Sequence, residues 1–252
     1  MPAETCIMFR GPYGLECRPH VNSELEVIFA TQGCIDVCVC GLTLSIQSGE
    51  AVFIFPYQPH SFYPKENATG QVYMFSYRIA ADFYNTYRAE GVTPFRFSLS
   101  QPLLDFLRYA QPAAETAPDE LHAKTLFFPL AAEFLKNINR NLTHLPGSQL
   151  VNQIMDYILN HLQDKITLKT LSAHFGINTI ALSKLIKTYT YSSFTDFVNN
   201  IRTEKAIQLF YEQDVSVTEA AYQSGFGSVR NFNRVFYNTV GITPSEYRRN
   251  KQ

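Results

Sequence analysis

The amino-acid sequence predicts an α+β protein with two domains: an N-terminal antiparallel β-barrel or sandwich with following helices, and an all-α C-terminal domain. A chain of 252 residues that is 46% hydrophobic can bury two modest cores. Short segments rich in Val, Ile, Phe and Tyr fill residues 24–77, whereas apolar residues recur every three or four positions after about residue 100. We expect domains at residues 1–142 and 149–252, joined by a linker at 143–148 that contains Pro and Gly.

Five segments of the first domain are predicted strands, and glycine-containing turns separate several of them: 25–31, 35–39, 42–46, 51–55 and 71–77. Several short strands at a spacing of roughly ten residues are typical of an antiparallel sandwich or small barrel. All five cysteines lie in the first forty residues and form no Cys-x-x-Cys pair, so neither a disulfide framework nor a zinc site is expected. Cys38 and Cys40 would share one face of a strand, which leaves a thiol sensor open beside the simpler interpretation of ordinary reduced cysteines.

Two helical stretches follow the strands, near residues 103–107 and 126–138, with apolar residues three and four positions apart. An apolar stripe on these helices could cover the barrel or could bind a second copy of the chain. Both interpretations stay open, so a homodimer is one expected assembly.

The second domain is expected to contain seven helices: about 149–163, 168–174, 179–188, 194–212, 216–223, 228–239 and 244–250. Capping signals mark four of these starts. Ser216–Glu219 and Thr243–Glu246 fit capping boxes, and Asn178 and Ser228 are placed as N-caps directly after turns.

This domain contains an internal repeat of a helix-turn-helix, with Gly176 in the first turn and Gly225 in the second, some fifty residues later. Glycine permits the sharp reversal between two closely packed helices. An α-helix fits the major groove of DNA, and exposed residues near its start can reach base edges. The intervening helix 194–212 would be roughly 28 Å long. One turn of DNA is about 34 Å, so two such units could enter successive grooves and bend the DNA.

Charge is unevenly divided along the chain. Residues 1–150 hold 10 Lys and Arg against 14 Asp and Glu, whereas residues 151–252 hold 11 against 8, so the second part is the one that could meet phosphate. No apolar run could span a membrane and the N-terminus does not resemble a leader, so we expect a soluble, cytoplasmic protein with no membrane partner. Phosphate-loop, nucleophile-elbow and zinc-protease motifs are absent, so we expect neither enzyme activity nor a cofactor.

The second repeat carries the most specific motif of the sequence. Its residues are Ala220-Ala221-Tyr222-Gln223-Ser224-Gly225-Phe226-Gly227-Ser228, Phe232, Arg234-Val235-Phe236, Gly241, Thr243-Pro244-Ser245 and Tyr247-Arg248. They resemble the second-repeat signature of the AraC/XylS family of bacterial transcription regulators, and the resemblance covers about 100 residues. It implies a sequence-specific transcription regulator that binds double-stranded promoter DNA, with RNA polymerase as a further partner if it is an activator. Two positions depart from the family: Tyr191 stands where glycine is frequent, and Tyr237 where lysine is common.

By matching position, the resemblance implies DNA contacts from the second helix of each unit. The candidate residues are Thr179, Ile180, Ser183, Lys184 and Lys187 in the first unit, and Val229, Arg230, Asn231, Asn233 and Arg234 in the second. Lys184, Arg230 and Arg234 are favoured because ammonium and guanidinium groups match guanine acceptors and phosphate oxygens. The alternative is that these charges merely solvate short helices, which explains a single residue better than the whole set.

The first domain resembles the cupin-like effector-binding domain of many such regulators, through residues 48–61, which end in Pro56-Tyr57-Gln58-Pro59-His60-Ser61. The resemblance implies a small-molecule effector in the mouth of the barrel, with a carbohydrate as one option. The candidate effector-binding residues are Arg10, Tyr13, His20, Glu24, Tyr57, His60 and Phe62.

Metal-dependent enzymes also use cupin barrels, which gives the alternative function of a cupin enzyme with a helical appendage. Their first motif usually has two closely spaced histidines and then a glutamate. Here only His20 with Glu24 precedes His60, so we expect no metal. A further alternative is a regulator without an effector, whose barrel serves only for dimerisation.

Overall fold

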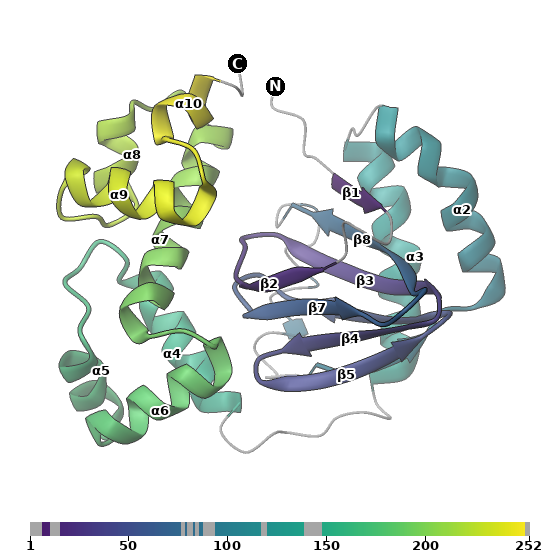
Figure 1. The fold of residues 1–252 in the computed structure, drawn as a ribbon, viewed down its shortest axis with the longest axis horizontal. Coiled ribbons are helices and arrows are strands. Elements are labelled where there is room, and N and C mark those ends of the chain that lie inside the picture. The colour runs from purple at the N-terminus through teal and green to yellow at the C-terminus, as the bar shows by residue number, and fades with distance from the viewer. Residues whose placement is uncertain are drawn as a thin grey trace. The chain divides into compact units, whose positions relative to one another are not determined.

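The N-terminal part of the chain consists of two antiparallel β-sheets that face each other, as the ribbon of the computed structural model shows (Figure 1). The structure describes residues 7–10, 16–76, 79, 83, 86–87, 94–116, 120–138 and 148–249. The chain divides into two compact units: the N-terminal unit contains most of the chain up to Gln149, and the C-terminal unit contains Leu150–Gln252 together with Val21–Ser23. The predicted linker, apart from Ser148, lies outside the described residues.

The first sheet has the strand order β1-β8-β3-β6-β9, with bounds Ile7–Arg10, Thr69–Phe75, Leu25–Gln32, Glu50–Ile54 and Arg96–Ser98. The second sheet has the order β2-β7-β4-β5, with bounds Cys17–His20, His60–Pro64, Cys34–Val39 and Leu42–Gln47. Every strand pairing in both sheets is antiparallel. The two-sheet fold class is thus confirmed, and the five predicted strands correspond to β3, β4, β5, β6 and β8.

Strand β3 shows how the two faces of the first sheet are used. Because side chains alternate along a strand, Ile28 and Ala30 point into the core between the sheets, with Val37 and Phe62 of the second sheet. Leu25, Val27 and Phe29 point to the opposite face and belong to a second core. Apart from Glu26, the buried part of the strand is therefore apolar on both faces, which is why residues 27–30 form a continuous hydrophobic run.

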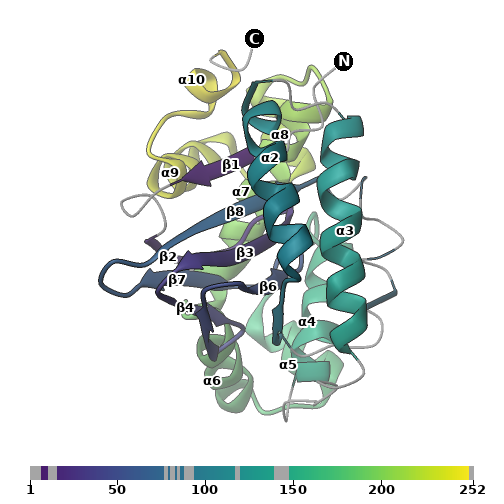
Figure 2. The same ribbon diagram turned by 90° about the vertical axis from the view of Figure 1, so that its right-hand side faces the viewer.

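Helices α2 (Gln101–Thr116) and α3 (Glu120–Ile138) run side by side and cover the outer face of the first sheet (Figure 2). The contact is rich in aromatic rings: Phe53 of β6 packs edge-on against Phe134 of α3, with ring centroids 5.0 Å apart. Edge-to-face pairs of this kind add to the free energy of burying each ring. These helices therefore cover the sheet, as one of the two sequence interpretations proposed.

The second unit is all helical, as predicted (Figure 1). Its described helices are α4 (Ser148–Asn160), α5 (Leu168–Phe175), α6 (Thr179–Thr190), α7 (Phe194–Glu212), α8 (Val217–Gln223), α9 (Val229–Val240) and α10 (Pro244–Arg249). Each lies within three residues of its predicted bounds. Among the described residues, no helix is long and apolar enough to span a membrane.

The predicted helix caps are all formed. The Asn178 side chain accepts hydrogen bonds from Ile180 N and Ala181 N at the start of α6, and Ser228 caps α9 in the same way through Asn231 N. Ser216 and Glu219 form a reciprocal capping box at α8. Thr243 and Glu246 do so at α10. These caps satisfy backbone N–H groups that a helix start otherwise leaves without partners.

The described cysteines Cys17, Cys34, Cys38 and Cys40 are free thiols. The expectation that Cys38 and Cys40 share one strand face is wrong, because β4 ends at Val39 and Cys40 has a positive φ of 49° in the following turn. Cys6 lies outside the described residues.

Candidate nucleic-acid interface and buried histidine site

The first helix-turn-helix consists of α5, a turn at Gly176 and α6. Gly176 has a left-handed φ of 64° and caps α5, and its N–H donates to the carbonyl of Ser172. Leu171 and Leu182 are fully buried and join the two helices. Consequently α6 buries one side and presents the other to solvent, where all five predicted contact residues are exposed: Thr179, Ile180, Ser183, Lys184 and Lys187.

Ile180 stands out on this surface because 79% of it is exposed. Exposure of a large aliphatic side chain to water is unfavourable. Ile180 lies in the first turn of α6, beside the N-cap. Apolar contact with the methyl group of thymine is one way in which proteins read the major groove. Its position therefore suits base recognition.

The second helix-turn-helix consists of α8, a turn at Gly225 and α9, and its own core contains Phe226, Phe232 and Phe236. Arg230, Asn233 and Arg234 are exposed on α9, as predicted. Val229 and Asn231 are half-buried, and Val229 packs against the core. Three of the five predicted residues are thus exposed on α9.

Asn231 has a different role on this helix. Its side-chain oxygen accepts a hydrogen bond from the guanidinium of Arg234, with an N–O distance of 2.9 Å, and its backbone N–H binds the cap residue Ser228. This hydrogen bond with Asn231 holds the side chain of Arg234 on the helix surface.

The two helix-turn-helix units are joined through α7 and through the segment that follows α4. The guanidinium of Arg202, on α7, donates from two nitrogens to the carbonyl of Leu162, at 3.1 and 2.9 Å, and donates to the carbonyl of Asp164 at 3.0 Å. The same Leu162 carbonyl lies against Gly225, where a Cβ atom would be only 1.8 Å from the oxygen. These contacts fix the turn of the second helix-turn-helix against the segment that follows α4.

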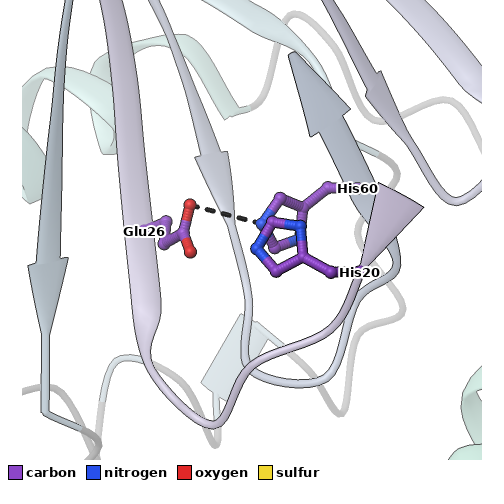
Figure 3. A group of neighbouring side chains, drawn as sticks. All are labelled: His20, Glu26 and His60. Atoms are coloured by element: carbon purple, nitrogen blue, oxygen red, sulfur yellow. Dashed lines mark ion pairs between the residues drawn. The ribbon is translucent and has the colours of Figure 1, made fainter. Parts of the chain in front are cut away.

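A group of titratable side chains lies at one end of the two sheets (Figure 3). His20 ends β2, His60 begins β7, and Glu26 lies near the start of β3, with its carboxylate directed at the imidazole rings. The Nε2 atom of His60 is 3.3 Å from a carboxylate oxygen of Glu26, and the ring centroids of the two histidines are 4.2 Å apart. His60 is fully buried and Glu26 is 2% exposed, so the ion pair is shielded from water.

The carboxylate of Glu26 sets the protonation order of the pair. Burial would lower the pKa of His60, but the charge of Glu26 and the hydrogen bond of Nδ1 with the Gln58 carbonyl outweigh it, so the pKa is raised. Burial and the adjacent His60 lower the pKa of His20. The first proton therefore resides on His60.

The remaining predicted effector residues are distributed as follows. The ring of Phe62 is tilted against that of His60, with centroids 5.4 Å apart, whereas Tyr57 is half-buried in the preceding turn with a φ of 63°. Glu24 precedes β3 and is not part of the His20–Glu26–His60 group. The backbone of Arg10 pairs with Gln71 in the first sheet, and Tyr13 lies outside the described residues.

Sequence reasoning missed Glu26, the acidic partner of both histidines. The alternation along β3 offered a signal, because Glu26 shares a strand face with Ile28 and Ala30. That face could be identified as the one between the sheets only after the pairing was known.

Comparison with known proteins relates the C-terminal unit to one domain family and the whole chain to individual proteins. Residues 171–250 match the helix-turn-helix domain family. An uncharacterized HTH-type transcriptional regulator of Staphylococcus aureus (strain MSSA476) is 36% identical over 99 residues, which cover 39% of this chain but only 13% of that relative. The HTH-type transcriptional activator RhaS of Salmonella schwarzengrund is 21% identical over 243 residues, which cover 92% of this chain and 87% of RhaS.

The fold as a whole matches ToxT from Vibrio cholerae. The crystal structure of ToxT with a bound unsaturated fatty acid has a TM-score of 0.55 and 15% sequence identity, and the match covers 98% of this chain and 92% of ToxT. A crystal structure of ToxT from strain O395 has a TM-score of 0.54 and 16% identity, over 98% of this chain and 94% of that one. Both of these curated relatives, the Staphylococcus aureus protein and RhaS, are named as transcription regulators. Residues 171–250 thus match a helix-turn-helix domain, and the chain as a whole is similar to HTH-type transcription regulators.

Proposed function

We propose that the chain is a sequence-specific transcription regulator in which α6 and α9 each enter a major groove of promoter DNA. The observation that supports this most directly is the pair of exposed surfaces on these helices. Each carries cationic and hydrogen-bonding side chains, Lys184 with Ser183 on α6 and Arg234 with Asn233 on α9. Each belongs to a separately capped helix-turn-helix, and the contacts of Arg202 hold the two units together.

The test is selection of genomic fragments by the full-length chain, followed by binding measurements at two salt concentrations. Arg234→Ala should weaken binding to the selected site by roughly 5- to 150-fold if Arg234 reads a base, and it should relax discrimination at one position. The matched control is Arg108→Ala, which removes an exposed arginine of α2 that pairs with Asp105. Equal, weak binding of every fragment, unchanged by either substitution, would contradict the proposal.

Ile180 gives a test that is independent of charge. Ile180→Ser should lower the preference for thymine at one position of the selected site, because the thymine methyl group loses its apolar contact. Ile180 is 79% exposed, so the thermal stability of the protein should be nearly unchanged. A variant that selects the same sequence would exclude this contact.

The length of α7 leads us to propose that the bound DNA bends. Its 19 residues correspond to roughly 28 Å. That is shorter than the helical repeat of DNA, about 34 Å, so bending would bring successive grooves within reach of both units. Circularly permuted fragments that all migrate alike in the complex would contradict bending.

We also propose that the N-terminal unit, which contains the sheets, forms a homodimer through α3. Leu121, Phe128 and Leu135 recur every seven residues and are exposed by 72%, 57% and 39%. This is the spacing with which a helix presents a stripe to a second helix, and a two-fold dimer would use the same stripe from both copies. Phe128→Glu should shift the full chain to a monomer in analytical ultracentrifugation, whereas Tyr63→Ser, which replaces an exposed aromatic residue on β7, should not.

A small-molecule effector in the first unit is the final part of the proposal. The sequence left a carbohydrate open, and a ToxT structure contains a fatty acid, so both classes merit screening. A ligand that binds only the folded state raises the unfolding temperature, so sugars and fatty acids should be compared by thermal shift on the full chain. If a ligand stabilises the chain without changing its DNA affinity, the first unit binds that ligand but does not regulate. The name of RhaS describes that protein as an activator. If this chain is an activator too, we propose RNA polymerase as a further partner.

A further inference from the structure

We propose that His20, Glu26 and His60 bind one divalent transition-metal ion of the zinc class inside the first unit. This inference does not depend on DNA binding, and the sequence led us to expect no metal. It rests on how three strands bring two imidazoles and one carboxylate together at the end of the sheets (Figure 3).

The spacing of the donor atoms fits a single ion. One donor atom from each residue lies within 4.8 Å of the other two, and His60 Nε2 is 3.3 Å from the Glu26 oxygen. Ligands about 2.1 Å from a tetrahedral ion are about 3.4 Å from one another. The Glu26–His60 edge is close to this length, and the other two edges are no longer than 4.8 Å.

The histidines are also oriented as metal ligands are. His60 Nδ1 is 2.7 Å from the Gln58 carbonyl, and His20 Nδ1 is 3.0 Å from the Arg18 carbonyl. A carbonyl only accepts, so in each ring Nδ1 is the donor and the lone pair of the neutral ring lies on Nε2. Metal-binding histidines are held by the same arrangement, in which the second ring nitrogen donates to a backbone carbonyl or carboxylate.

Charge favours a cation at this position. The Glu26 carboxylate is 2% exposed, and a buried carboxylate is costly unless a positive group compensates it. Without a metal, protonated His60 compensates it; a divalent ion would take the place of that proton and would bind the Nε2 lone pairs of both imidazoles. His20 is only half-buried, which gives the ion a route to the site from solvent.

The donor set defines the class of ion. Two imidazoles and one carboxylate suit zinc, iron, cobalt and nickel, whereas magnesium and calcium prefer oxygen ligands alone. Three protein ligands leave a fourth position for water or for an oxygen or nitrogen atom of a bound small molecule. The thiol of Cys17 is 3.4 Å from His20 Nδ1 and 4.0 Å from Nε2, outside the group of three.

The test is titration of the full-length, chelator-treated chain with Co²⁺, because tetrahedral Co²⁺ has strong visible absorption that reports its ligands. We expect one Co²⁺ per chain, displacement by Zn²⁺, and a rise in the unfolding temperature of roughly 5 °C or more at Zn²⁺ about 100-fold above the Kd. His20→Gln and Glu26→Gln should each weaken binding at least ~10-fold. Circular dichroism of the metal-free variants should match that of the parent, which shows that the variants are folded. Because His20 is the least buried of the three ligands, His20→Gln should be tolerated best.

Two controls distinguish this site from other thiol or histidine ligands. His161→Gln removes a histidine of an exposed pair with Asp164 in the second unit, and it should leave Co²⁺ binding unchanged. Cys17→Ser should also leave the spectrum unchanged. The proposal is overturned if the parent binds no Co²⁺, if His20→Gln and Glu26→Gln bind it as the parent does, or if only Cys17→Ser removes the spectrum.

Discussion

Gly176 and Gly225 occupy matching turns of the two helix-turn-helix units, and both have a positive φ, 64° and 90°. Their surroundings differ. A Cβ atom on Gly176 would meet nothing within 4 Å, whereas one on Gly225 would lie 1.8 Å from the carbonyl oxygen of Leu162. The first glycine is required only by its backbone conformation, and the second is also required by packing. Replacing the same residue at matching positions of a repeat can thus change the free energy of unfolding by very different amounts.

The largest expected effect comes from adding a methyl group at these two positions. Gly225→Ala should destabilise the second helix-turn-helix by about 3–5 kcal/mol, because the strain of a left-handed alanine adds to displacement of the Leu162 carbonyl. Gly176→Ala should cost only about 1 kcal/mol, from strain alone. Urea unfolding followed by circular dichroism measures both values, and equal losses would show that the Gly225 contact relaxes freely.

The next effect concerns the arginine that contacts the same carbonyl. Arg202→Met should cost about 2 kcal/mol, because it removes the hydrogen bonds to Leu162 and Asp164 and leaves their oxygens without this donor. Arg248→Met is the matched control. It breaks an ion pair with Asp214, which is 83% exposed, and should change the free energy of unfolding by less than about 0.5 kcal/mol. If both variants unfold alike, Arg202 does not join the two units.

The ends of the two recognition helices give a third comparison. α6 is capped by Tyr191 with a φ of 56°, and α9 by Gly241 with a φ of 85°. A left-handed conformation costs a non-glycine residue roughly 1 kcal/mol. Tyr191→Gly should therefore stabilise the protein by up to about 1 kcal/mol, and Gly241→Ala should destabilise it by a similar amount. Thermal unfolding of both variants measures the difference, and a loss of stability in Tyr191→Gly would mean that side-chain contacts of Tyr191 outweigh its strain.

The smallest effect separates the caps by their charge. The helices of the first helix-turn-helix are capped by neutral side chains, Thr167 and Asn178. In the second helix-turn-helix, the capping box of α8 includes Glu219, whose pKa is lowered by its hydrogen bonds with Ser216. A carboxyl with a lowered folded pKa stabilises above its unfolded pKa, and this contribution is lost as pH falls through the folded value. The stability difference between the parent and Glu219→Gln should thus shrink from about pH 7 to about pH 3. A difference that does not change with pH would exclude this carboxylate as the stabilising group.

The helical unit was predictable because its signals are local. Asn178, Ser216, Ser228 and Thr243 act on residues two or three positions away, so the caps and the helix starts could be read without the fold. The contact between Gly225 and Leu162 joins residues more than sixty positions apart. No local pattern indicates it.

The sheets were less predictable for a related reason. β2 and β7 contain Pro19 and Pro64 and are short, and β9 has only three residues, so their patterns resemble turns. The grouped side chains of His20, Glu26 and His60 lie on strands whose pairing sets their distances. Sequence reasoning chose both histidines but took Glu24 for the acidic partner, because the bend before β3 was not visible.

The central claim is that both helix-turn-helix units read one DNA site from the same face. The most direct measurement is the affinity of the full chain for its selected site, and for the same site with about 5 bp inserted between the two half-sites, which is half a helical turn. We predict that the insertion lowers the affinity because one recognition helix loses its contacts with DNA. If α9 is the helix displaced, Arg234→Ala should not lower the affinity further. If α6 is displaced, Lys184→Ala should not lower it further. Unchanged affinity after the insertion would contradict the account, because a single unit would then account for all specific binding.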